Sequence, residues 1–424
     1  MPFCLTAFEG SVISVLVRIA FEGAVGVTLL NYVSGFLAVT PALANITSFI
    51  WVRIGHGRDK IRFIRTLQLV VIGLVGVMGF VPLSEVGLVG LSAGVFLART
   101  CWSGISTIRS TVWHANYPQG TRARVTGKFA IVQVALIAFL SWGLGQAMDR
   151  NANAFRLMFP VGALLGFVAF LLWGGIRVRG QAALIKRETE GDVRDMPSFN
   201  PASLARVLID DHAYARYMFC QFLLGMGNIT AMVVLPVMMR ERFDADYSQA
   251  LWITSSISLA TMPLAIPLWA RFLDHTHIVH FRAVHSWVFV GALGMLSLAA
   301  WTGRYEWLYV FAVLKGIGFG GGVLGWTLGH LDFAPAGKES QYMGVHVTLT
   351  GVRGVLAWIG GMWLYGVFAD PARPELSAVT PMICLVVTTL GAIGFVVMSR
   401  GYRAPPSTRP AGAPEPAPPV RASE

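Results

Sequence analysis

The sequence predicts an all-helical membrane protein with about twelve transmembrane helices, arranged as two similar six-helix halves. The first observation is composition, because 55% of the 424 residues are hydrophobic and only 13% are charged. In soluble proteins about 25% of the residues are charged. The second is that apolar stretches of about 20 residues, long enough for a helix to cross the bilayer core, recur along the chain. The third is an internal repeat.

The repeat relates the middle of the chain to its end. Residues 114–120 read His-Ala-Asn-Tyr-Pro-Gln-Gly, and residues 330–337 read His-Leu-Asp-Phe-Ala-Pro-Ala-Gly. The histidines and the prolines of the two copies keep almost the same separation (330 − 114 = 216 and 335 − 118 = 217). Trp51 and Trp269 are also related in this way (269 − 51 = 218). Parallel repeats in an apolar chain are typical of transporters whose sites lie where the two halves meet.

The apolar stretches give the expected helices in order. In the first half, residues 1–176, we expect spans near 3–24, 28–52, 63–81, 86–113, 129–148 and 158–176. In the second half, residues 214–400, we expect them near 215–239, 250–273, 284–301, 307–328, 345–368 and 378–398. Lipid offers backbone groups no hydrogen bonds, so stretches of this length are predicted to be helices.

Two polar segments lie outside the spans. Residues 177–213 carry charges of both signs and two prolines, which predicts a cytoplasmic linker between the halves. Residues 401–424 are rich in proline and poor in apolar residues, which predicts a disordered cytoplasmic tail. No removable signal peptide is expected, because the first apolar run serves as the first span.

The net charge of +11 reflects topology. Basic residues gather after the second, fourth and sixth spans, within residues 53–65, 122–128 and 177–194. By the positive-inside rule these loops and both termini are cytoplasmic, which predicts a multi-pass protein of the cell's inner membrane. No basic stripe is interleaved with exposed aromatic residues, so nucleic-acid binding is not expected.

The spans, the cytoplasmic termini and the long middle loop resemble the major facilitator superfamily of secondary transporters. That family usually carries a loop of Gly, Asp-Arg and Gly-Arg-Arg/Lys after the second span of each half. Here the first copy keeps Gly57 and Arg58 but has Ile54 at the aspartate position, and the second copy keeps Asp274 without the glycines. Proton-driven drug antiporters of the family have a Gly-Pro pair in the fifth span, which residues 141–146 lack.

The repeat also locates two intramembrane cations. Arg99 precedes His114 by 15 residues (114 − 99 = 15), and Lys315 precedes His330 by the same number (330 − 315 = 15). At 1.5 Å per residue each cation lies about 22 Å along its helix from the cytoplasmic loop. The resemblance implies that these helices border a central cavity, where two facing cations suit an anionic substrate. The alternative is that both cations are neutralised by neighbours and only hold helices together.

Other residues are weaker candidates. Arg353 and His346 share a face of the eleventh span and extend the expected cationic lining. Glu9 and Glu22 of the first span are candidates for proton coupling, although Glu22 also stands one turn from Arg18 and can simply pair with it. A polar and aromatic pocket is completed by residues that can equally serve helix packing: Gln221, Asn228 and Trp326.

Several motifs are discounted. The glycines of residues 316–322 resemble a dinucleotide fingerprint, but no strand precedes them, so we expect close helix packing and no cofactor. Three histidines at 275, 277 and 280 lack further metal ligands, and the four cysteines form no ligand pattern, so no metal site is expected. His114 and His330 are interpreted as hinges of a gate at cytoplasmic helix ends.

These observations predict a secondary transporter that moves a small organic solute, preferably anionic, by alternating access between two halves. It is expected to act as a monomer in the lipid bilayer, with proton or ion coupling left open. One alternative is an exporter of lipophilic or cationic compounds, and another is a non-transporting sensor or assembly factor. No nucleophile and base pair lies within the spans, so an enzyme is not expected.

Overall fold

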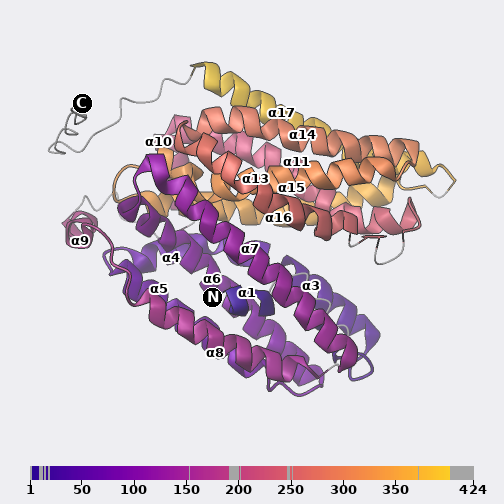
Figure 1. The fold of residues 1–424 in the computed structure, drawn as a ribbon, viewed down its shortest axis with the longest axis horizontal. Coiled ribbons are helices and arrows are strands. Elements are labelled where there is room, and N and C mark those ends of the chain that lie inside the picture. Colours follow the sequence, from indigo (N-terminus) through magenta and orange to yellow (C-terminus); the bar gives the residue numbers. More distant parts are fainter. Residues whose placement is uncertain are drawn as a thin grey trace, which may run out of the picture.

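The computed structural model describes residues 2–8, 13, 16–17, 20–151, 153–190, 200, 202–245, 249–250, 252–370 and 372–401. Within these residues the chain is helical and no named strand occurs, which confirms the predicted all-α class. The helices form two bundles, the first drawn from indigo to magenta and the second in pink, orange and yellow (Figure 1).

The described part of the first half contains seven helices. They are α1 (Pro2–Ala7), α3 (Val27–Ile46), α4 (Ser48–Gly55), α5 (Lys60–Met78), α6 (Glu85–Asn116), α7 (Gln119–Arg150) and α8 (Phe155–Trp173). Of these, α3 and α4 together occupy the second predicted span. The predicted linker contains two helices, α9 (Gln181–Glu190) and α10 (Ala202–Asp210). The predicted tail, apart from its first residue, lies outside the described residues.

The second half repeats this arrangement. Its elements are α11 (His212–Glu241), the π-helical turn η2 (Trp252–Ser256), α13 (Ile257–Asp274), α14 (Ile278–Thr302), α15 (Glu306–Leu328), η3 (Gly329–Asp332), α16 (Glu339–Phe368), η4 (Pro374–Ala378) and α17 (Val379–Gly401). In the described chain nine helices are long and apolar enough to cross a membrane, or ten if the bent pair α3 and α4 counts as one span. The exact bounds of the two halves remain a prediction.

The second span is broken where the sequence predicts one continuous helix. α3 and α4 meet at a bend of 42° around Thr47. The Thr47 hydroxyl donates to the carbonyl oxygen of Ala44 at 2.7 Å, so it satisfies a backbone acceptor that the break releases. Pro41 lies inside α3 and weakens the helix one to two turns earlier. The bend turns the end of this span toward the second half.

Two groups of contacts hold the halves together. α3, α4 and α6 pack on α16, and α7 packs on α13. Gly351 allows the closest approach, because a Cβ atom there would lie 2.5 Å from the carbonyl oxygen of Ala42 and 2.7 Å from the amide nitrogen of Ile46. Both neighbours are backbone atoms, which cannot swing away as a flexible side chain would. The α3–α16 crossing therefore requires glycine at this position.

One end of the molecule carries most of the polar contacts between halves, and we call it the α9 side after the linker helix there (Figure 1). His114 Nδ1 meets Glu339 Oε1 at 2.6 Å, and the Thr111 and Ser340 hydroxyls are 2.7 Å apart. Ser48 donates to the Gly344 carbonyl oxygen at 2.8 Å. These contacts close the interface between the halves at the α9 side.

Asp274, in the loop motif of the second half, adds a further closure. Its carboxylate accepts hydrogen bonds from the backbone N–H groups of Ala123 (2.8 Å) and Arg124 (3.1 Å) in the first turns of α7. Arg124 Nε also donates to it at 3.0 Å. A carboxylate at a helix amino terminus satisfies free N–H groups and the helix dipole. The second copy of the motif therefore joins the halves by capping a helix of the other half.

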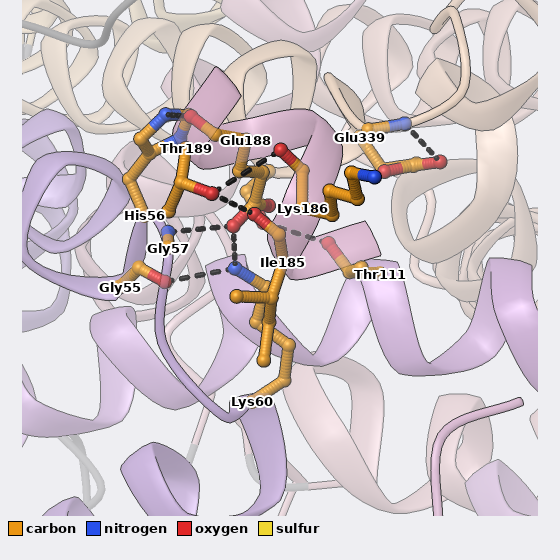
Figure 2. Close-up of polar contacts among 12 residues, drawn as sticks. Gly55, His56, Gly57, Lys60, Thr111, Ile185, Lys186, Glu188, Thr189 and Glu339 are labelled. Atoms are coloured by element: carbon orange, nitrogen blue, oxygen red, sulfur yellow. Dashed lines mark hydrogen bonds and ion pairs between the residues drawn. The ribbon is translucent and has the colours of Figure 1, made fainter. Parts of the chain in front are cut away.

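The linker supplies the corresponding carboxylate to the first copy, where Ile54 replaces the aspartate. Figure 2 shows Glu188 of α9 beside this loop, with its Oε2 accepting from the Gly57 N–H and from Lys60 Nζ, both at 2.6 Å. Glu188 and Lys60 are both buried. Gly57 has φ +67°, a conformation that side chains disfavour. His56 Nε2 also meets the Glu188 carbonyl oxygen at 2.8 Å, and burial lowers the pKa of His56, so a neutral ring donates this bond.

Gly351→Ala tests the helix crossing. Its methyl group must push α3 away from α16, so we expect the Tm of the purified protein to fall by several degrees, since overpacking costs about 1–3 kcal/mol. Gly360→Ala is the matched control on the same helix, because nothing lies within 4 Å of a Cβ atom there. Equal Tm values for the two variants would contradict the close crossing.

Asp274→Asn tests the cap. The amide keeps one acceptor oxygen but loses the charge that binds α7 and Arg124, so we expect a loss of about 1–3 kcal/mol, seen as a lower Tm. Asp59→Asn is the control, because Asp59 also caps a helix but accepts only from Arg62 N–H at 2.9 Å and from Gln181 Nε2 of the linker at 2.7 Å, with no bond to the second half in the described structure. The interpretation fails if Asp59→Asn lowers the Tm as much as Asp274→Asn does.

Candidate functional site

A cavity of about 220 Å³ lies between the two halves. Its walls come from α3, α6 and α7 of the first half and from α15 of the second half. Its lining is Pro41, Asn45, Arg99, Trp102, Ser106, Arg109, Trp113, Thr126, Phe129, Ala130, Gln133, Val134, Val323, Leu324, Trp326 and Thr327. Two guanidinium groups and three indole rings therefore border one space, and no carboxylate lines it within the part of the chain that the structure describes.

Arg99 is among the residues that line this cavity. Its side chain is buried, with 7% of the residue exposed. Nε donates to the carbonyl oxygen of Phe8 at 2.8 Å, and the guanidinium lies 5.1 Å from the centre of the Phe8 ring. These contacts tie α6 to the first span, so Arg99 has a structural role as well as a place at the cavity.

Arg109 is the second cation of the cavity, and sequence analysis did not identify it. The guanidinium lies 5.9 Å from the centre of the Trp113 ring. Its Nε has no hydrogen-bond partner among the described residues. No salt bridge found in the described chain includes Arg109. This side chain is thus a cation that faces the cavity without a neutralising partner in the described structure.

Polar and aromatic groups complete the lining. Asn45 from α3 and Gln133 from α7 bring amide groups, and three hydroxyl groups come from Ser106, Thr126 and Thr327. Trp326, a predicted site residue, lines the cavity and donates its indole N–H to the Thr350 hydroxyl at 3.3 Å. Amides and hydroxyls both donate and accept hydrogen bonds, and the indoles provide flat apolar surface. The cavity can therefore hold a small polar molecule with an apolar part.

Lys315 does not line this cavity, in contrast to the predicted pairing with Arg99 across it. Its Nζ donates to the carbonyl oxygen of Thr254 in η2, inside the second half. The same ammonium group lies 5.9 Å from the ring centres of Phe311 and Phe319. The internal repeat preserves the position of the cation along the helix, but the face of α15 that carries Lys315 packs against its own half.

Four other predicted residues also lie inside the second half. Arg353 Nη1 donates to the backbone carbonyl oxygen of Gln221 at 2.8 Å, which joins α16 to α11. His346 is fully buried and its ring lies edge-on to Trp326, with centroids 5.6 Å apart. Asn228 is buried in α11. None of these residues lines the described cavity.

Of the remaining predicted residues, Glu22, His114 and His330 are absent from the lining of the cavity. Glu9 and Arg18 fall outside the described residues, so the predicted pairing of Arg18 with Glu22 does as well. Glu22 is exposed after the first span. His114 and His330 lie at the α9 side, where His114 pairs with Glu339 and His330 is fully buried. Their predicted role as hinges of a gate remains a prediction.

The cavity residues missed by sequence analysis share one cause. The internal repeat identifies residues with a counterpart in the other half, and the counterpart of Arg109 is glycine (109 + 216 = 325, Gly325). A different signal was present, because Arg109 is an ionisable residue inside a predicted span, five residues before His114 (114 − 109 = 5). Asn45 and Gln133 gave no such signal, since uncharged amides within helices are common.

The comparisons with known proteins agree on the fold. Residues 217–424 match the sequence model described as the Major Facilitator Superfamily. No curated protein matches the chain by sequence. Among solved structures, an E. coli fucose:proton symporter is similar with a TM-score of 0.67 and 11% identity, over 93% of this chain and 96% of that one.

Two other solved structures are similar to the same degree. A proton:xylose symporter aligns with a TM-score of 0.67 and 13% identity, over 91% of this chain and 92% of that one. A bacterial homologue of the iron transporter ferroportin, in its outward-facing state, aligns with a TM-score of 0.67 and 12% identity, over 94% of this chain and 99% of that one. By these comparisons residues 217–424 match the major facilitator superfamily, and the chain is a multi-pass membrane protein whose fold is similar to that of these transporters.

Proposed function

We propose that this secondary transporter moves a small organic anion through the cavity between its two halves. The observation that carries the proposal is Arg109, a guanidinium at the cavity with no neutralising partner in the described chain. A charged side chain at membrane depth costs several kcal/mol unless it meets water or an opposite charge. A substrate carboxylate or phosphate, bound by two parallel N–H···O bonds, provides that charge.

The size and surface of the cavity support a small substrate with an apolar body. Its volume of about 220 Å³ is below the 300–1,000 Å³ of typical drug-sized sites. Trp102, Trp113 and Trp326 supply flat apolar walls. Arg99 and Arg109 are ten residues apart (109 − 99 = 10), or about 15 Å along α6, so we assign the anionic group to Arg109 and place Arg99 further along the path.

Alternating access follows from the contacts between halves. We propose that the α9 side is cytoplasmic, because the basic loops 53–65 and 122–128 lie at that side and positive loops remain inside. The contacts of His114, Asp274 and Ser48 close this side. The described conformation is then closed to the cytoplasm, and transport requires these contacts to break as the halves rock. We also propose that the transporter acts as a monomer in the inner membrane.

Coupling to protons is supported by similarity, because two structural neighbours are proton symporters. Glu9 remains our candidate for the coupling carboxylate, since Glu22 is exposed. Export of cationic compounds is disfavoured, because the described lining carries two cations and no carboxylate.

A neutral sugar is the second candidate substrate. The three indole walls together with the amides of Asn45 and Gln133 suit stacking and hydrogen bonding to a sugar ring. A neutral sugar would leave the charge of Arg109 without a partner, so we rank a sugar below an organic anion as the substrate.

Arg109→Gln tests the proposal in proteoliposomes. The protein is reconstituted and uptake of labelled lactate, succinate, benzoate and xylose is measured, with Arg150→Gln as a control, since Arg150 is exposed at the far end of α7. Loss of charge-assisted bonds worth about 1.5–3 kcal/mol should raise the KM for a transported anion about 10- to 150-fold. The control should keep wild-type uptake.

Three results would contradict the anion proposal. One is uptake of xylose with no uptake of any anion, which favours the sugar. Another is an unchanged KM for a transported anion in Arg109→Gln. The last is an equal loss in Arg150→Gln, which would point to a nonspecific effect of removing positive charge.

A further inference from the structure

A second group of buried basic side chains, two arginines and two histidines, lies inside the second half, apart from the cavity. We call it the cation cluster and define it by Arg282 of α14, His330 of η3, and His346 and Arg353 of α16. The exposed fraction is 1% for Arg282, 6% for Arg353 and 0% for both histidines. None of the four lines the described cavity. Proteins bury guanidinium groups in this way only with partners, so their surroundings require an explanation.

The four side chains approach one another from three elements. The rings of His330 and His346 have centroids 6.5 Å apart. Arg282 and Arg353 both lie close enough to His346 for their charges to act on it, and close enough to act on each other. Side chains on a helix lean toward its amino terminus, so Arg353 points along α16 toward the α9 side, where the others lie. The elements thus direct two guanidinium groups and two imidazole rings toward one region.

Glycine residues of neighbouring helices make room for this cluster. A Cβ atom at Gly325 would lie 2.6 Å from Nη2 of Arg282, and one at Gly225 would collide with the guanidinium of Arg353. One helical turn before Gly325, a Cβ atom at Gly321 would collide with the ring of His285. The glycines of the tenth span therefore leave space for polar side chains of neighbouring helices, in addition to allowing close helix packing.

The cluster has donors without acceptors. Arg353 Nη1 donates to the Gln221 carbonyl oxygen at 2.8 Å, and Arg282 Nη1 lies 3.3 Å from His285 Nδ1. The Nε atoms of both arginines and both ring nitrogens of His330 and His346 have no hydrogen-bond partner in the described structure. No Asp or Glu among the described residues forms a salt bridge with any of the four.

Two buried acidic residues of the α9 side form their bonds with groups outside the cluster. Asp332 accepts from the Ile278 N–H at 2.8 Å and from Gln119 Nε2 at 3.3 Å. Glu339 binds His114 and the Gly337 N–H. A buried donor without an acceptor destabilises the folded state, and an unpaired buried charge does so more. Each neutral imidazole has one donor and one acceptor nitrogen, so the region holds at least four unpartnered donors: the Nε–H of each arginine and one N–H of each histidine. Together with the two guanidinium charges, these donors point to an anionic partner.

We propose that the cation cluster binds a small inorganic anion, of the size of chloride to phosphate, between α11, α14, α15 and α16. The candidates are small anions, because the helices approach closely at the glycines and the guanidinium groups fill the space beside them. Arginine Nε–H groups and imidazole N–H groups are suitable donors to such an ion. The site is separate from the cavity of the proposed function and does not depend on the identity of the transported substrate.

The site links two helices that matter for rocking. α16 carries two members of the cluster on one side and packs on α3 and α4 of the first half on another. An anion held by α14, η3 and α16 stabilises the position of α16 within its own bundle. Trp326 joins this region to the cavity, because its ring contacts His346 and lines the cavity wall.

Thermal unfolding of the full-length protein in detergent tests the site. The Tm is measured in sodium chloride, sodium nitrate and sodium phosphate against sodium gluconate at equal ionic strength. A ligand that binds only the folded state raises the Tm in a saturable way. We expect a rise of roughly 3 °C or more in at least one of the inorganic anions. His346→Gln and Arg353→Met should abolish most of this rise, and Arg353→Lys should restore part of it.

Arg109→Gln is the matched control, since it removes a cation of the cavity and leaves the cluster intact. It should keep the full rise, which separates this site from the proposed substrate site. Because the arginine variants can fail to fold, the His330→Gln and His346→Gln variants and the anomalous signal of bromide in crystals provide independent readouts. Equal Tm values in all four salts, an undiminished rise in His346→Gln, or bromide found only outside the cluster would overturn the proposal.

Discussion

The cost of a charge at membrane depth is the constraint on which the rest of this structure depends. Lipid provides no counter-ion, so every buried cation must find an acceptor, an aromatic face, water or an anionic ligand. Arg99 and Lys315 find backbone carbonyl oxygens at Phe8 and Thr254. Arg109 and the cation cluster find no such full complement within the described chain. The presence or absence of an acceptor therefore distinguishes cations that hold helices together from those that we propose bind a ligand.

The interface between the halves obeys a second constraint, because it must be tight and still separable. Gly351 lets the backbones of α3 and α16 come into close contact. The α9 side is instead closed by polar contacts, of which the pair His114 and Glu339 and the cap by Asp274 are the main ones. Polar contacts can be exchanged for water when the halves separate, whereas buried apolar surface cannot be exposed at so small a cost.

The linker illustrates how a degenerate motif can be completed from elsewhere in the chain. The first loop copy has Ile54 at the position where the resembled family carries aspartate, and Glu188 of α9 places its carboxylate against Gly57 and Lys60. A match to the loop motif alone would count this copy as incomplete. The missing negative charge is supplied by Glu188, which lies 131 positions after Gly57 (188 − 57 = 131). No pattern in the neighbouring sequence indicates this contact.

The sequence by itself determined the helical class, the approximate positions of the spans and the presence of two related halves, because hydropathy and internal repetition are encoded along the chain. It also placed Arg99 and Trp326 on helices that line the cavity. Only the tertiary structure decided which face of each helix meets the cavity. Lys315 occupies the repeated position yet bonds within its own half, and Arg109 faces the cavity although its repeat counterpart is Gly325. A repeat conserves position along a helix, whereas helix rotation and packing between distant segments decide what each side chain contacts.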